Sequence, residues 1–326
     1  MKRNTENSGS KRGQCLAVIL AAFSFPAVVA AQDQCSGLDP TIQALLESMS
    51  SSALTIDYRG VVTLQRGGDM QILEMSHRVV NGAQTETVTR LTGQDASVRR
   101  TRRSGNCIGS ANDPLGSGQC AVSSVCELAD VYRFRVSKGE MVAGRDAIRL
   151  RAEPLDMYRF GYVFELDRET ALTLKSTTLS ADQRVLEQFQ FASLQMVARS
   201  SDSPNAGQGA SRQSATEPMD ASSDAPMPNR MGPKWEPSWV PEGFAATSET
   251  PMESQRKSYT DGLSSFSVFI EPLTVPINPG EGVEREGSTV AYTRCIEANQ
   301  NPVLVTVVGE IPTNTARMVA DSVRMR

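Results

Sequence analysis

The histidine content limits the chemistry that this chain can carry, because its 326 residues include a single histidine, His77. A Ser-His-Asp triad, a Cys-His dyad and a histidine-based zinc site would each have to use that residue. The sequence also has no Gly-x-Ser-x-Gly, P-loop, His-Glu-x-x-His or dinucleotide-binding motif. We therefore expect His77 to be a structural or solvent-facing strand residue. We expect the protein not to be an enzyme, and we expect no cofactor and no metal.

The six cysteines are the other reactive side chains. Five of them follow the N-terminal segment described below: Cys35, Cys107, Cys120, Cys126 and Cys295. An odd number leaves at least one thiol unpaired within a single chain. Three lie close together in a stretch rich in Gly, Ser and Asn, where the spacing does not fix the partners. We predict a Cys107–Cys120 disulfide, with Cys295 as the unpaired thiol.

Four arginines form a basic cluster in an acidic protein: Arg99, Arg100, Arg102 and Arg103. Guanidinium groups bind phosphates and carboxylates through paired hydrogen bonds, so the cluster is a candidate docking point for an anion or a partner. Charged side chains are also common along exposed sheet edges, where they discourage pairing with other chains. The edge interpretation is the favoured one, and the sequence leaves both open.

An apolar stripe occupies every second position between Met157 and Asp167. Its members are Tyr158, Phe160, Tyr162, Phe164 and Leu166. Period-two alternation predicts a strand with these five side chains on one face. The stripe is either ordinary core against a helix or the wall of a pocket that admits an amphiphile.

The first 31 residues have the pattern of a signal peptide for export. Basic residues lie near the start, Cys15–Phe25 is apolar, and Pro26 precedes small residues suited to cleavage. The apolar run is short for a bilayer-spanning helix, although an uncleaved anchor is the alternative. Removing this basic segment makes the net charge more negative than the −4 of the whole chain. An acidic mature protein argues against nucleic-acid binding.

The elements that carry these residues are mostly strands. Asp39 and Pro40 predict a helix start, and apolar spacing extends that helix over 39–52. Strands are expected at 58–66, 70–80, 83–91 and 96–103, then a loop over 104–126, then strands at 131–137, 141–152, 157–167, 171–180 and 185–197. Short strands joined by tight turns indicate an antiparallel meander that curls around the helix.

Residues 198–234 contain almost no large apolar side chains and predict a disordered linker. The remainder predicts a small α+β domain, with a hairpin around Asp261-Gly262, strands at 289–296 and 303–308, and a helix from Pro312. Its expected buried anchors are Trp235, Trp239, Phe244 and Tyr259. The predicted organisation is a signal peptide (1–31), a large β domain (32–197), the linker (198–234) and the small domain (235–326).

Several stretches resemble the MucB/RseB family. In the large domain they are Tyr58–Gly68 (YRGVVTLQRGG), Asp167–Thr170 (DRET) and Val185–Gln195 (VLEQFQFASLQ). In the small domain they are Trp239–Phe244 (WVPEGF), Tyr259–Glu271 (YTDGLSSFSVFIE) and Val307–Pro312 (VVGEIP). They occur in the family's order over nearly all of the mature chain.

This resemblance implies an α+β protein of the periplasm. Its large domain is expected to be a half-open antiparallel β-barrel clasping a helix, similar to lipoprotein carriers, beside a smaller α+β domain. The implied function is negative regulation of an envelope-stress sigma factor, by binding the periplasmic part of a membrane anti-sigma factor and shielding it from proteolysis. A lipid or lipopolysaccharide is the expected releasing ligand. The alternative is a periplasmic carrier of lipids or acylated proteins, and either protein could form a homo-oligomer.

Overall fold

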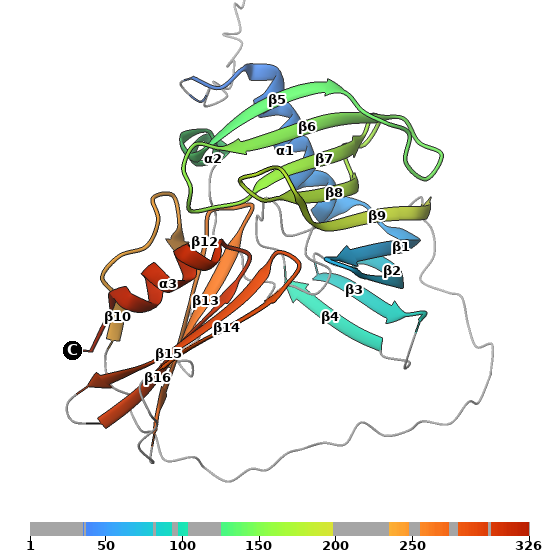
Figure 1. Cartoon of the computed structure of the whole chain (residues 1–326). Coiled ribbons are helices and arrows are strands. Elements are labelled where there is room, and N and C mark those ends of the chain that lie inside the picture. Colours follow the sequence, from blue (N-terminus) through green and yellow to red (C-terminus); the bar gives the residue numbers. More distant parts are fainter. Residues whose placement is uncertain are drawn as a thin grey trace, which may run out of the picture. The chain divides into compact units, whose positions relative to one another are not determined.

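The structure is a computed structural model of the whole chain (Figure 1). It describes residues 35, 37–80, 83–92, 97–103, 125–197, 235–247, 255–273, 280–298 and 301–325. The expected signal peptide, the Cys107–Cys120 disulfide and the linker 198–234 lie outside these residues. Among the described helices, none has the length and apolar character needed to cross a bilayer.

The larger sheet has nine antiparallel strands in the order β4-β3-β2-β1-β9-β8-β7-β6-β5. The strands are β1 (Tyr58–Arg66), β2 (Asp69–Val80), β3 (Ala83–Arg90), β4 (Ser97–Arg103), β5 (Tyr132–Lys138), β6 (Ala147–Pro154), β7 (Gly161–Asp167), β8 (Thr173–Leu179) and β9 (Val185–Met196). The sheet is open, with β4 and β5 at its two edges. The expected fold class is confirmed: an α+β protein with a half-open antiparallel barrel that clasps a helix, beside a smaller α+β part.

Helix α1 (Pro40–Thr55) packs on the β5–β7 half of this sheet (Figure 1). Its start is the predicted one, since the Asp39 side chain accepts a hydrogen bond from the Thr41 amide at 2.7 Å. Leu46 and Met49 are buried on its apolar stripe. They share one core cluster with Leu150 and Phe164 of the sheet. The helix therefore covers the face that the aromatic stripe was expected to present.

Three predictions of local structure in this region are wrong. The loop expected to reach residue 126 ends earlier, because Val125–Val131 forms helix α2, which buries Leu128 and Val131. The strand expected over 141–152 begins only at Ala147. Ala143 and Gly144 before it have φ angles of 49° and 75°, which form a turn. The strand expected over 157–167 begins at Gly161, and the site description below gives the reason.

Residues 235–325 form the second part of the described chain. Its six-stranded antiparallel sheet has the order β11-β12-β13-β16-β15-β14, and a β10–β17 pair stands beside it. The elements are β10 (Trp235–Pro237), β11 (Ala245–Ala246), β12 (Arg256–Thr260), β13 (Ser265–Pro272), β14 (Glu281–Glu286), β15 (Thr289–Ala298), β16 (Asn301–Gly309), α3 (Thr313–Ser322) and β17 (Val323–Met325). Helix α3 and the sheet enclose one apolar core. Sequence periodicity missed β14 because all six of its residues are exposed.

Candidate functional site

A buried ion pair lies at the centre of the candidate site. Arg159 and Asp261 have fully buried side chains, and Arg159 Nη1 lies 2.8 Å from Asp261 Oδ2. The Tyr132 hydroxyl donates to the same Oδ2 at 3.1 Å. Asp156 pairs with Arg159 Nη2 at 2.9 Å, and the guanidinium carbon lies 5.1 Å from the centre of the Phe244 ring. These five residues are called the Arg159 cluster below.

The Arg159 cluster joins the two parts of the described chain. Tyr132, Asp156 and Arg159 belong to the part before residue 198, and Asp261 and Phe244 belong to the part after residue 234.

A further donation from Arg159 Nη2 to the Glu242 carbonyl oxygen adds to this junction. Gly243 follows with a φ of 82°, and a Cβ placed on it would lie 2.7 Å from Val131 Cγ1. The close approach leaves no room for a side chain at Gly243.

Local turns hold the two charges in place. Asp261 Oδ1 accepts from the Leu263 and Ser264 amides at 3.0 and 2.7 Å, in the β12–β13 turn. On the other side, Asp156 Oδ1 accepts from the Tyr158 amide at 2.9 Å, which bends the chain before β7. This bend places Arg159 in the cluster instead of in a strand. It is also why the expected strand starts late, since Asp side chains favour such turns.

Burial dominates the electrostatics of the cluster. It raises the pKa of Asp261, and the positive charge of Arg159 and two backbone amides oppose that effect. The pKa of Tyr132 is raised well above its ordinary value, first by burial and then by the nearby Asp261 carboxylate. Tyr132 therefore stays neutral and acts as a hydrogen-bond donor to the ion pair.

A second polar contact joins the two parts at a different place. Arg66 Nε lies 3.1 Å from Glu187 Oε2, and the Ser288 hydroxyl donates to the same oxygen at 2.9 Å. Arg66 and Glu187 are paired across β1 and β9, and Ser288 lies in the β14–β15 turn.

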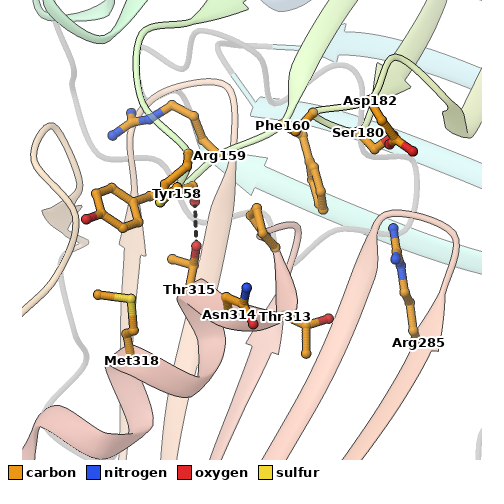
Figure 2. A pocket seen from close by; sticks show the side chains of 13 residues that line it. Tyr158, Arg159, Phe160, Ser180, Asp182, Arg285, Thr313, Asn314, Thr315 and Met318 are labelled. Carbon is orange, nitrogen blue, oxygen red and sulfur yellow. Dashed lines mark hydrogen bonds between the residues drawn. The ribbon is translucent and has the colours of Figure 1, made fainter.

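A pocket of about 350 Å³ lies between the β8–β9 turn, the bend before β7, and α3 (Figure 2). Figure 2 shows Tyr158 beside Thr315 and Met318, and Phe160 farther along the pocket, toward Arg285 of β14. The Thr315 hydroxyl donates to the Tyr158 carbonyl oxygen at 3.1 Å. The lining residues are Met157, Tyr158, Arg159, Phe160, Ser180, Ala181, Asp182, Arg285, Pro312, Thr313, Asn314, Thr315 and Met318.

The structure divides the five stripe residues between two environments. Tyr158 lies in the bend, outside β7, and its ring meets the Trp239 ring edge-on at 5.3 Å, so its placement on the strand face is wrong. Phe160 lines the pocket and also contacts the core. The other three residues are at most 3% exposed and pack in the α1 core: Tyr162, Phe164 and Leu166. The first two members thus line the pocket of Figure 2, and the other three belong to the core.

The basic cluster falls on β4, an edge strand of the large sheet. Arg100 is paired with Glu86 of β3 in the antiparallel register, and Arg99, Arg102 and Arg103 continue along the same strand. The side chains of these arginines lie outside the described residues. Their backbone position agrees with the edge interpretation and leaves the docking role as a prediction.

The aromatic anchors expected in the small domain are buried with one exception. Trp235, Phe244 and Tyr259 are at most 8% exposed, whereas Trp239 is half-buried and packs against the edge of that core.

His77 has the structural role expected of it. It is 6% exposed, its Nδ1 lies 2.7 Å from the Ile56 carbonyl oxygen, and its ring stacks on Tyr58 at 5.4 Å. Over the described ranges, no cluster of three histidine, cysteine or carboxylate residues is arranged to hold a metal ion.

The disulfide in the structure is one that sequence reasoning missed. Cys35 and Cys126 are bonded across 91 residues of sequence and link the chain just before α1 to α2. The local clustering of three cysteines favoured a short-range pair, and no sequence signal brings Cys35 to Cys126 without the fold. Cys295 has no disulfide partner within the described part of the chain, as expected.

Two family models match the chain: the MucB/RseB N-terminal domain over residues 41–214 and the MucB/RseB C-terminal domain over residues 229–324. A relative in Pseudomonas aeruginosa, sigma factor AlgU regulatory protein MucB, is 33% identical over 280 residues, which cover 82% of this chain and 85% of the relative. Sigma-E factor regulatory protein RseB of Salmonella typhimurium is 25% identical over 308 residues, covering 88% and 92%.

Solved structures agree with the sequence matches. The structure of the Pseudomonas aeruginosa MucA/MucB complex matches with a TM-score of 0.64 at 30% identity, covering 88% of this chain and 99% of that one. A second structure, of MucB in complex with MucA(peri), matches with a TM-score of 0.62 at 30% identity, covering 87% and 98%.

Proposed function

Because this chain belongs to the MucB/RseB family, we propose that it is a periplasmic negative regulator of an envelope-stress sigma factor. In this proposal it binds the periplasmic part of a membrane anti-sigma factor and shields that segment from proteolysis. The observation that carries the proposal is the match, over nearly nine-tenths of the chain, to MucB in complex with MucA(peri).

The contacts between the two parts of the chain support a regulatory role. They include a small number of specific polar interactions at the Arg159 cluster and at Glu187, with a pocket that draws residues from both parts. A ligand can shift such an arrangement only through different affinities for its alternative states. A pocket lined by both parts would bind a ligand with different affinities in the two states, because moving one part against the other changes the shape of the pocket.

We further propose that the releasing ligand is a lipid or lipopolysaccharide that enters at Tyr158 and Phe160. Apolar side chains supply much of the pocket wall there, among them Met157, Pro312 and Met318. The rest of the stripe is covered by Leu46 and Met49 of α1, so an acyl chain would reach Phe164 only after α1 moves. This would explain why a helix is clasped against the aromatic face.

Met318→Glu tests the ligand site. Met318 is 41% exposed, so the variant should fold, and a carboxylate in the pocket wall should weaken binding of an acyl chain. We expect a several-fold loss of affinity for a fluorescent fatty acid and for lipopolysaccharide. Met141→Glu is the matched control, because Met141 is 68% exposed and does not line the pocket. Unchanged affinity in folded Met318→Glu protein would move the site elsewhere.

The alternative function, carriage of lipids or acylated proteins, is separated by partner capture. The mature protein is used to capture partners from a membrane extract, and these are identified by mass spectrometry before and after lipopolysaccharide is added. An anti-sigma factor that is captured and then released by lipopolysaccharide supports regulation. Capture of lipoproteins alone, with no anti-sigma factor, would support carriage and overturn the regulatory proposal.

A further inference from the structure

The Cys35–Cys126 disulfide holds a short helix that borders the Arg159 cluster. Helix α2 has seven residues, and a helix of this length is unstable in water without tertiary contacts. Cys126 is its second residue and is bonded to Cys35, which precedes the first residue of α1, Pro40, by a short segment. The disulfide thus fixes the N-terminal end of α2 to the start of α1.

The C-terminal end of α2 leads directly into the junction between the two parts of the chain. Val131, its last residue, lies against Gly243. The next residue, Tyr132, donates its hydroxyl to Asp261, and the centre of its ring lies 5.5 Å from the Arg159 guanidinium carbon. A change in the position of α2 therefore reaches the buried ion pair through Tyr132, the residue that follows the helix.

We propose that the Cys35–Cys126 disulfide is a reversible modification site whose reduction loosens the Arg159 cluster through Val131 and Tyr132. A dithiol reductant is the co-reactant. One of its thiolates attacks a sulfur of the disulfide, the S–S bond breaks, and the second thiol closes the reductant to its own disulfide. Two electrons and two protons pass to Cys35 and Cys126, which become thiols.

Exposure at the disulfide is uneven. Cys35 is 8% exposed, whereas Cys126 is only half-buried, so the Cys126 side is the accessible one. Access is one of the factors that decide which sulfur a thiolate attacks.

Hydrogen exchange measured by mass spectrometry tests the proposal on the mature protein. A Cys107→Ser plus Cys120→Ser variant is used, so that reduction reports on one disulfide alone. Reduction with dithiothreitol at neutral pH should speed amide exchange at least about tenfold in residues 125–134 and also in residues 258–264, around Asp261. The Cys35→Ser plus Cys126→Ser variant should show the same pattern without reductant, and Cys295→Ser should exchange like the unmodified protein.

Three results would overturn the proposal. The first is mass mapping that finds no Cys35–Cys126 bond in protein taken from the periplasm. The second is full reduction with unchanged exchange in residues 125–134. The third is faster exchange in residues 125–134 with no change in residues 258–264, which would mean that the disulfide anchors α2 alone. Circular dichroism of each sample separates these outcomes from general unfolding.

Discussion

At the scale of single residues, the Arg159–Asp261 pair combines a high desolvation cost with a favourable interaction. Both side chains are fully removed from water, and each charge is compensated by the other and by hydrogen bonds. Buried ion pairs of this kind contribute little net stability compared with apolar replacements, but the loss of one partner leaves an uncompensated charge. The pair therefore makes the arrangement of the junction specific.

Arg159→Met should lower the free energy of unfolding by roughly 3–5 kcal/mol, because Asp261 would remain buried without its counter-charge. Urea denaturation followed by circular dichroism measures the change. Arg184→Met is the control, since Arg184 and its partner Asp182 are 75% and 58% exposed and such pairs contribute about 1 kcal/mol or less. Equal effects of the two substitutions would show that the Arg159 pair is solvated in solution.

Gly60→Ala should destabilise the protein by roughly 1–3 kcal/mol, the usual cost of overpacking. An added Cβ on Gly60 would collide with the Ser193 carbonyl oxygen and lie 2.8 Å from the Phe191 ring, where β1 pairs with β9. Gly68→Ala is the matched control, because a Cβ there meets nothing within 4 Å. A shared urea midpoint for the two variants would contradict this close approach.

At the scale of elements, sequence periodicity located most strands of the large sheet and the start of α1. It failed where local polar contacts change the direction of the chain. At Asp156 such a turn keeps Tyr158 and Phe160 out of β7, although both fit the alternating pattern of the strand. It also missed α2, because seven residues hold too few turns to display a period. The pairing of β1 with β9 could not be predicted, since strand order depends on contacts distant in sequence.

The β7–β8 turn should make the free energy of unfolding depend on pH, through the carboxylate of Asp167. Burial opposes ionisation of Asp167, but hydrogen bonds from Arg145 and Thr170 outweigh burial and lower the pKa of Asp167 below its ordinary 3.8. A lowered pKa in the folded state adds stability that is present above about pH 4 and is lost as the pH falls through the folded value.

Asp167→Asn removes this titration and measures its contribution. The variant should be less stable than the unmodified protein at pH 7, and the difference should shrink on acidification to pH 2–3. Unfolding free energies at several pH values give the comparison. A constant difference across this range would show that Asp167 does not titrate in the folded protein.

At the scale of the whole molecule, the resemblance in sequence led to the correct family and to the sheet-rich fold. The junction between the two parts could not be predicted, because Arg159 and Asp261 are 102 residues apart and no sequence signal pairs the one with the other. Asp261 was expected only as a turn residue. The division into domains at 198–234 remains a prediction from composition.

Limited proteolysis tests that division. Trypsin should cut the mature protein first within 199–234, where Arg212 and Arg230 lie among residues with little apolar content. The two fragments should stay together on size-exclusion chromatography, because the Arg159 cluster and the Glu187–Ser288 contact join them. A first cut within 57–100 would refute the division, and separation of the native fragments would refute the junction.

The central position of β1 has a consequence for how the chain reaches this fold. Arg66 pairs with Glu187, 121 residues later, so one side of β1 stays unsatisfied until the last strand of the sheet arrives. Hairpins such as β1–β2 form in microseconds, whereas pairing of β1 with β9 must first close a loop of more than a hundred residues and is slower. Over this interval Val62 and Leu64 lie on an open strand edge, which invites pairing between unfolded molecules. Refolding yield should therefore fall as protein concentration rises, with misassembly beginning at β1.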